Sequence, residues 1–345
     1  MPSSERGGPL SPPPIKDHPA LERRAPFGAP APETAALAAD LEAKLKDAPD
    51  PWTVPVDLVR RLRAEGKGVL PIDGPRPESV WVETPPARGP AAPGRVRLST
   101  PEGGGEGPWR GLYLHIHGGG WTFGAPEQFD GRNLRLARAS GFAVASAAYR
   151  LAPEHKWPAG LEDCVAAARW ALSVARARGA PLVIGGESAG AHLAAATLLR
   201  LRADGIAVAD AVRAAVLIYG CFDLAMTPSM AAWGPRCLVL STPIVAWFVG
   251  NLLDEGADAR APEISPLRAD LSGMPPALFQ VGDADPLLDD TLFMAERWRA
   301  AGAEAHLAVW PGAPHAFDYF DRPADALPIA AQAQDLSAEF IQSLI

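Results

Sequence analysis

The chain has few cysteines and no long apolar run. Three cysteines occur among 345 residues, at Cys164, Cys221 and Cys237. An odd number of widely spaced thiols argues against a disulfide framework and favours a reducing compartment. No run of about 18 apolar residues occurs, and the first residues lack the apolar core of a secretion signal. We therefore expect a cytoplasmic protein without stable membrane insertion.

Clustered positive charge is also missing. The formal net charge is −8, and no basic stripe follows any segment. Binding to a nucleic-acid backbone requires clustered lysine and arginine, so nucleic acid is not expected as a partner. Hydrophobic residues make up 48% of the chain, enough for a large buried core. The composition leaves the formation of a homo-oligomer open.

The distribution of proline and apolar residues divides the chain into three parts. Residues 1–32 are rich in proline and poor in aromatic residues, which predicts a disordered tail. Residues 33–75 carry leucine and valine at helical spacing and predict two amphipathic helices. Residues 76–345 form the third part. Within it, an apolar stretch at about 222–265 is too long for an ordinary connection and predicts a helical lid.

Short apolar runs alternate with helical patterns in the third part. This alternation predicts an α/β fold with a mostly parallel sheet of eight strands and helices on both faces. The functional residues should then lie at the carboxyl ends of the strands. The expected strands lie near 80–82, 95–98, 112–116, 142–146, 182–184, 215–219, 277–281 and 306–310, and the helices between and after them near 127–139, 160–178, 189–202, 287–301 and 328–344.

Residues 186–190 (GESAG) stand between a predicted strand and a predicted helix. This is the Gly-x-Ser-x-Gly pattern of a nucleophile elbow. The glycines allow a sharp turn and close packing of the following helix on the strand. Ser188 is therefore the candidate nucleophile, and the amino end of the helix favours negative charge beside it.

A serine nucleophile requires a base, and three histidines follow Ser188. His192 lies on the helix after the elbow and cannot turn back toward the serine. His306 begins a predicted strand, whereas His315 follows the carboxyl end of that strand. His315 is therefore the expected base.

Two carboxylates are candidates for orienting the base. Asp283 and Asp285 both leave the end of the strand at 277–281, and from the spacing alone either could reach a neighbouring loop. The other would then serve as a turn or capping residue.

A glycine run directly follows the strand at 112–116. Residues 117–121 (HGGGW) leave the backbone amides bare for an oxyanion. His115 and His117 lie two apart, but no third or fourth ligand occurs at metal spacing, so no metal site is expected. We expect His117 to hold the glycine loop in shape.

Four motifs together resemble the hormone-sensitive-lipase branch of the α/β-hydrolases, the bacterial esterases with an HGGG loop. The similarity covers roughly residues 78–345, and its motifs lie at 117–121 (HGGGW), 149–155 (YRLAPEH), 186–190 (GESAG) and 285–287 (DPL). The resemblance implies a triad of Ser188, Asp285 and His315. It also implies that the N-terminal helices and the insertion join into a cap over the pocket. Oxyanion donors would come from the amides of Gly119, Gly120 and Ala189, with His117 and Gly118 supporting the loop.

The sequence departs from the family pattern at two positions. Glu187 stands where aspartate is frequent, and Leu288 stands where arginine is common. We expect a carboxylic ester hydrolase that acts on short to medium acyl esters through an acyl-enzyme, without cofactor or metal. An acyltransferase with the same mechanism is the first alternative. A small-molecule receptor is the second, although the receptors of this family lack the catalytic histidine that His315 would supply.

Overall fold

A computed structural model describes residues 28–89, 92–105, 107–321 and 327–345. The predicted tail of residues 1–32 therefore lies mostly outside the described residues. The first helix, α1 (Pro32–Leu45), begins at the proline that ends this segment. Proline is favoured in the first turn of a helix because no intrahelical acceptor is available for an amide hydrogen there.

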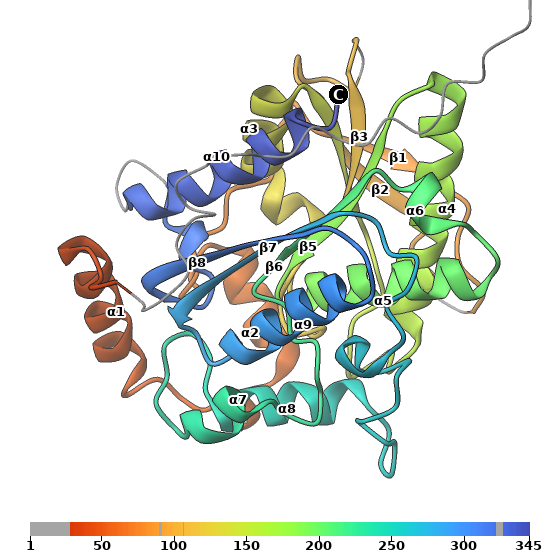
Figure 1. Cartoon of the computed structure of the whole chain (residues 1–345). Coiled ribbons are helices and arrows are strands. Elements are labelled where there is room, and N and C mark those ends of the chain that lie inside the picture. Colours follow the sequence, from red (N-terminus) through yellow and green to blue (C-terminus); the bar gives the residue numbers. More distant parts are fainter. Residues whose placement is uncertain (1–27, 90–91, 106, 322–326) are drawn as a thin grey trace, which may run out of the picture.

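One sheet of eight strands organises the rest of the chain (Figure 1), with the order β1-β2-β4-β3-β5-β6-β7-β8. The two pairings made by β2, with β1 and β4, are antiparallel, and all the others are parallel. The predicted α/β fold with a mostly parallel sheet is confirmed. The strands are β1 (Val80–Glu83), β2 (Arg95–Ser99), β3 (Gly111–Ile116), β4 (Phe142–Ala147), β5 (Leu182–Glu187), β6 (Ala214–Ile218), β7 (Ala277–Ala284) and β8 (Ala305–Pro314).

Helices cover both faces of the sheet (Figure 1). On one face, α3 (Asp130–Ser140) and α10 (Pro328–Gln342) share a buried cluster with the strands. On the other face, a larger cluster contains residues of α4 (Ala159–Arg178), α5 (Ala189–Ala203) and α9 (Leu288–Ala300). Successive side chains of each strand point to opposite faces of the sheet and therefore contribute to two separate hydrophobic cores. The predicted helices lie within a few residues of these positions, and the short α6 (Val208–Ala211) is an addition.

Strands β7 and β8 run further than the sequence pattern predicted. They pair as far as Ala284 and Pro314, with a register shift between Gly282 and Ala284. The extra pairing carries the chain past two glycines and two prolines, residues that usually end a strand. As a result Asp283 lies within β7, while Asp285 and His315 directly follow their strands.

Four helices lie beyond the carboxyl ends of the parallel strands (Figure 1). Two precede the sheet, α1 and α2 (Val56–Ala64). The other two belong to the insertion after β6, namely α7 (Pro228–Trp233) and α8 (Thr242–Leu252). Leu41 of α1 packs in one cluster with Leu238 of the insertion, and also with Phe320 and Leu327. The apolar face of α1 is therefore buried against the insertion and against the segment before α10.

Arg60 ties α2 to the core. Its guanidinium donates to the carboxylate of Glu154 at 2.8 Å and to the carbonyls of Thr122 and Ala152. The insertion is held to the core by the amide of Trp157, which donates to the carbonyl of Leu252 at 2.8 Å. Within the described ranges, no helix is both long and apolar enough to cross a bilayer.

Candidate active site

Ser188 sits at a sharp turn between β5 and α5. Its backbone has φ 57° and ψ −122°, a conformation that few residues other than glycine adopt. A Cβ on Gly186 would lie 2.1 Å from the carbonyl oxygen of Ile116, and one on Gly190 would lie 1.9 Å from the same atom. Only glycine fits at these two positions. The sequence pattern thus produces the predicted elbow.

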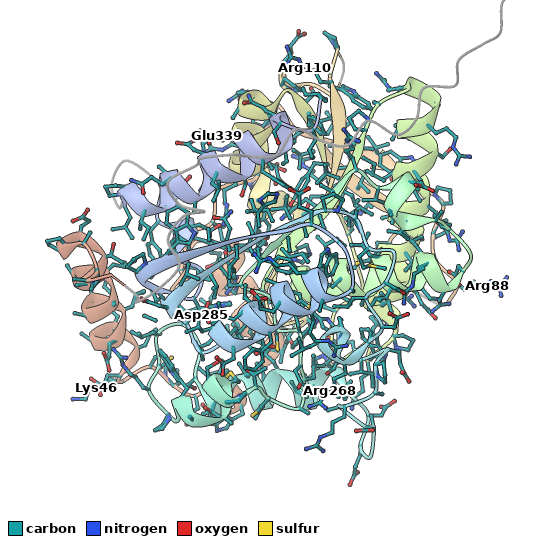
Figure 2. The ribbon with its side chains drawn as sticks, in the orientation of Figure 1. Lys46, Arg88, Arg110, Arg268, Asp285 and Glu339 are labelled. Carbon is teal, nitrogen blue, oxygen red and sulfur yellow. The ribbon has the colours of Figure 1, made fainter. Side chains whose placement is uncertain are left out.

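Three side chains form one hydrogen-bonded chain. The hydroxyl of Ser188 lies 2.9 Å from Nε2 of His315, and Nδ1 of His315 lies 2.7 Å from Oδ2 of Asp285. Because a carboxylate only accepts, Nδ1 carries the hydrogen and Nε2 is free to accept from the hydroxyl of Ser188. Asp285 is buried, and its other oxygen accepts the amide of Leu287 at 2.9 Å. Figure 2 shows Asp285 inside the molecule, while Lys46 and Arg88 reach its outline.

The remaining candidate residues have other partners. The carboxylate of Asp283 accepts the amide of Gly312 and so links β7 to β8. His192 is buried and joins the indole of Trp121 to the carbonyl of Ile264. His306 pairs with Glu304, which directly precedes β8. Of the two carboxylates left open by the sequence, the structure brings Asp285 and not Asp283 to His315.

The glycine loop after β3 lies beside the serine. Gly119 and Gly120 have φ 124° and 59°. A Cβ on Gly119 would lie 2.2 Å from the carbonyl oxygen of Phe123, and one on Gly120 would lie 2.4 Å from the ring of Phe248. Within the described part of the chain, the amides of Gly119, Gly120 and Ala189 donate no hydrogen bond. These three amides are available to an oxygen of a substrate.

His117 is engaged within the loop. Its Nδ1 lies 2.9 Å from the carbonyl oxygen of Gly118, and its ring stacks on Tyr149, whose hydroxyl donates to the carbonyl of His117. Burial lowers the pKa of His117 to about 4, so the imidazole is neutral near pH 7. The described residues contain no group of three or more histidine, cysteine or acidic side chains placed to hold a metal ion.

Glu187 links the elbow to the glycine loop, a role that the sequence did not reveal. Its Oε1 accepts the amide of Gly118 at 2.7 Å, and its Oε2 lies 2.9 Å from Nε2 of His115. Burial would raise the pKa of Glu187, but His115, Arg132 and the Gly118 amide together hold it below its ordinary value. The carboxylate therefore stays ionised. The only indication of this role in the sequence was that Glu187 stands where the family frequently has aspartate.

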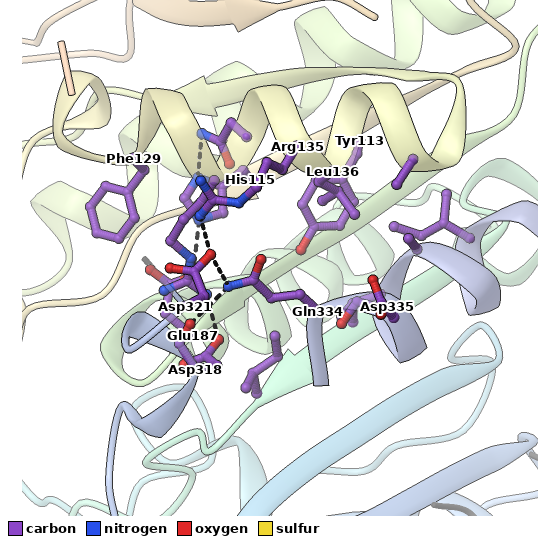
Figure 3. A pocket seen from close by; sticks show the side chains of 18 of the residues that line it. Tyr113, His115, Phe129, Arg135, Leu136, Glu187, Asp318, Asp321, Gln334 and Asp335 are labelled. Carbon is purple, nitrogen blue, oxygen red and sulfur yellow. Dashed lines mark hydrogen bonds and ion pairs between the residues drawn. The ribbon is translucent and has the colours of Figure 1, made fainter. Parts of the chain in front are cut away.

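A small cavity of about 210 Å³ lies behind the elbow, on the α3 and α10 side of the sheet (Figure 3). Glu187 and Asp318 face it together with His115. Asp318 pairs with Arg132 and accepts the hydroxyl of Tyr219. The ring of Tyr219 in turn lies edge-on to His315, with centroids 4.7 Å apart. Two sets of polar contacts thus lie behind the site: Glu187 with His115 at the elbow, and Asp318 with Arg132 and Tyr219 next to the catalytic histidine.

A much larger cavity, of about 940 Å³, opens in front of Ser188 and His315. Its walls are mainly apolar and come from three places: the helices before the sheet, the glycine loop and the insertion. The larger aliphatic and aromatic hydrocarbon side chains that line it are those of Leu45, Trp52, Val54, Val59, Leu62, Val69, Leu70, Phe123, Val239, Leu240, Ile244 and Phe248. A largely apolar ligand that carries a polar reacting group fits such a site.

Residues 113–319 match the family described as the alpha/beta hydrolase fold. The chain belongs to the α/β-hydrolase family. A carboxylic ester hydrolase of Mycobacterium tuberculosis is 35% identical over 237 residues, which are 66% of this chain and 62% of the relative's length. The match therefore spans somewhat less than two thirds of that relative.

Solved structures of α/β-hydrolases extend the similarity to nearly the whole chain. A hyperthermophilic esterase from the archaeon Pyrobaculum calidifontis has a TM-score of 0.76 and 31% identity, covering 92% of this chain and 99% of that one. A hormone-sensitive lipase from a metagenome library has a TM-score of 0.75 and 26% identity, covering 92% and 99%. The resemblance to the hormone-sensitive-lipase branch is confirmed.

Proposed function

We propose that this α/β-hydrolase is a carboxylic ester hydrolase that works through an acyl-enzyme on Ser188. The observation that carries the proposal is the hydrogen-bonded chain from Ser188 through His315 to Asp285, placed beside three free amides at the floor of an apolar cavity. The similarity to proteins named as esterases supports the same activity.

In the proposed reaction each group of the site has one step. His315 takes the proton of Ser188 at Nε2 while the serine oxygen attacks the ester carbonyl. The amides of Gly119, Gly120 and Ala189 donate to the oxyanion of the tetrahedral intermediate. His315 then returns the proton to the departing alcohol, and water, activated by the same imidazole, releases the acid. Asp285 holds the imidazole in the required tautomer and stabilises its charged form.

We further propose that α1, α2 and the insertion act together as a cap over the cavity. Arg236 of the insertion pairs with Glu42 of α1 at 3.0 Å, and residues of all three elements line the cavity. The ring of Phe248 packs on Gly120, and this close approach supports a preference for short to medium acyl chains. The three free cysteines support a reducing, cytoplasmic location.

The direct test combines covalent labelling of the serine nucleophile with measurement of ester hydrolysis. Wild type should react with a fluorophosphonate at Ser188, identified by peptide mass spectrometry, and should hydrolyse p-nitrophenyl butyrate. The Ser188→Ala and His315→Ala variants and the double variant should lose similar factors in kcat, because the two groups act as a unit. Full activity of Ser188→Ala would refute the proposal. Adding an alcohol and measuring the new ester separates acyl transfer from hydrolysis.

A further inference from the structure

Within the described residues, two cations on the wall of the large cavity have no ion pair, the exposed Lys46 and Arg63. Arg63 lies in the last turn of α2 and lines the cavity that holds Ser188. Its Nε is fully buried without a hydrogen-bond partner. Throughout the described ranges, no carboxylate or carbonyl accepts from any of its nitrogens. A buried charge is normally paired, because an unpaired one loses its hydration without compensation.

The lack of acceptors around Arg63 contrasts with the surroundings of another arginine of the same helix. Arg60 stands one turn earlier on α2, and all its nitrogens find acceptors in Glu154 and two carbonyls. The other cations of the cavity wall that carry an ion pair are Lys67, with Glu65, and Arg236, with Glu42. Lys46 also lacks an ion pair, but its side chain is exposed, whereas Arg63 has a buried nitrogen without an acceptor.

The surroundings of Arg63 connect it to the reacting end of the cavity. Its guanidinium lies over the ring of Phe123, 5.7 Å from the centroid. The amide of Phe123 donates to the carbonyl of Gly119 at 2.8 Å, so one aromatic ring separates Arg63 from the glycine loop. Burial lowers the pKa of Arg63 and the nearby Tyr319 partly offsets that change. Arginine nevertheless remains protonated at any pH at which the protein works.

We propose that Arg63 binds a carboxylate carried by the ester substrate, which makes the preferred substrate an ester with a second, ionised acid group. A planar guanidinium presents paired N–H donors that match the two oxygens of a carboxylate. The carboxylate supplies the counterion that the protein omits, and the apolar walls hold the chain between the two groups. This inference rests on the proposed ester hydrolysis and adds the class of substrate.

The experiment compares charged esters with neutral esters of the same shape. Monoethyl esters of succinic, glutaric, adipic and pimelic acid are each paired with the ester in which the free carboxylate is replaced by a carboxamide. Acetate esters of hydroxy acids, with their carboxamide analogues, place the charge on the alcohol side instead. Acid release is followed by titration, and kcat and KM are measured for every pair.

We expect wild type to favour the carboxylate member of the best pair by about 10-fold or more in kcat/KM, mostly through KM. In Arg63→Gln that ratio should fall to about one, and in Arg63→Lys a part of it should remain. Lys67→Gln removes the same charge from the same cavity, but Lys67 is exposed and already paired with Glu65. This control should keep the wild-type ratio.

The outcomes separate the two proposals. Hydrolysis of neutral esters without any preference for the carboxylate would overturn the role of Arg63 and leave ester hydrolysis standing. A preference that survives in Arg63→Gln would place the carboxylate elsewhere. No hydrolysis of any ester, together with an unlabelled Ser188, would refute the proposed function itself. Should Arg63→Gln fail to fold, competitive inhibition of wild type by free dicarboxylates, with their diamides inactive, tests the same site.

Discussion

Glu187 offers the sharpest test of how the active site is built. Its carboxylate is the shared acceptor of the Gly118 amide and of His115, and it is almost fully buried. Replacement by alanine leaves both donors without a partner inside the protein. An unsatisfied buried group costs about 1–3 kcal/mol, so Glu187→Ala should lower the free energy of unfolding by about 3 kcal/mol.

Activity should fall further than stability alone explains. The glycine loop is held at the correct distance from Ser188 through Gly118, and a displaced oxyanion donor costs about 100-fold in kcat. We expect Glu187→Ala to lose about this factor in kcat with little change in KM. Glu187→Gln keeps an acceptor for Gly118 but loses the charge, so its losses should be about 1 kcal/mol and about 10-fold in kcat.

The assays are p-nitrophenyl butyrate kinetics and urea unfolding at several pH values. Because the pKa of Glu187 is lowered in the folded protein, the carboxylate contributes stability that is present above the unfolded pKa of about 4.3 and lost as the pH falls through the folded pKa. The difference between wild type and Glu187→Gln should therefore shrink below about pH 4. Wild-type kcat in Glu187→Ala would refute the assigned link between the elbow and the glycine loop.

Three further predictions follow from the triad, from a buried carboxylate of α9 and from the position of the N-terminal helices. Asp285→Asn should lose several powers of ten in kcat because the amide favours the wrong imidazole tautomer, whereas Asp283→Asn should be much milder; the reverse ranking would move the triad to Asp283. Burial raises the pKa of Asp290 to about 7, so the folded protein holds this proton more tightly than the unfolded chain, and stability should decline as the pH rises from about 4 to 7. In Asp290→Asn that slope should be reduced, and identical pH profiles of Tm would contradict the assignment. Deleting residues 2–30 should leave an active esterase, whereas deleting residues 2–73 should cause aggregation or an altered chain-length preference, and an unchanged ester profile would show that α1 and α2 are not part of the cap.

Patterns within short segments were enough to predict the sheet and most of its helices. Each strand and helix carries its own periodicity, so eight strands and the helices between them could be placed without knowing their neighbours. The elbow could also be predicted from a short segment, because two glycines and a serine in five residues define it. The choice between Asp283 and Asp285 could not be made from a short segment. It depends on the pairing of β7 with β8, which turns Asp283 toward Gly312.

Contacts between distant segments could not be predicted from single residues. Asp290 accepts the amides of Phe222 and Asp223, at 2.7 and 2.9 Å, and thereby anchors the start of the insertion to α9. From the sequence it is one more acidic residue in the first turn of a helix. Arg63 is likewise one of three arginines within α2 in the sequence, and only the fold shows that it lacks acceptors. The catalytic roles of Ser188 and His315 stay predictions until the variants are made.

The packing of α1 has a consequence for how the protein is made. Leu41 is synthesised early, but the residues that bury it include Leu238, Phe320 and Leu327, which leave the ribosome much later. At roughly 5–20 residues per second, the apolar face of α1 waits on the order of tens of seconds for its partners. During that time the apolar face of the first helix lacks the residues that bury it in the folded protein. The apolar face of α1 is therefore among the first surfaces to be synthesised and among the last to be buried.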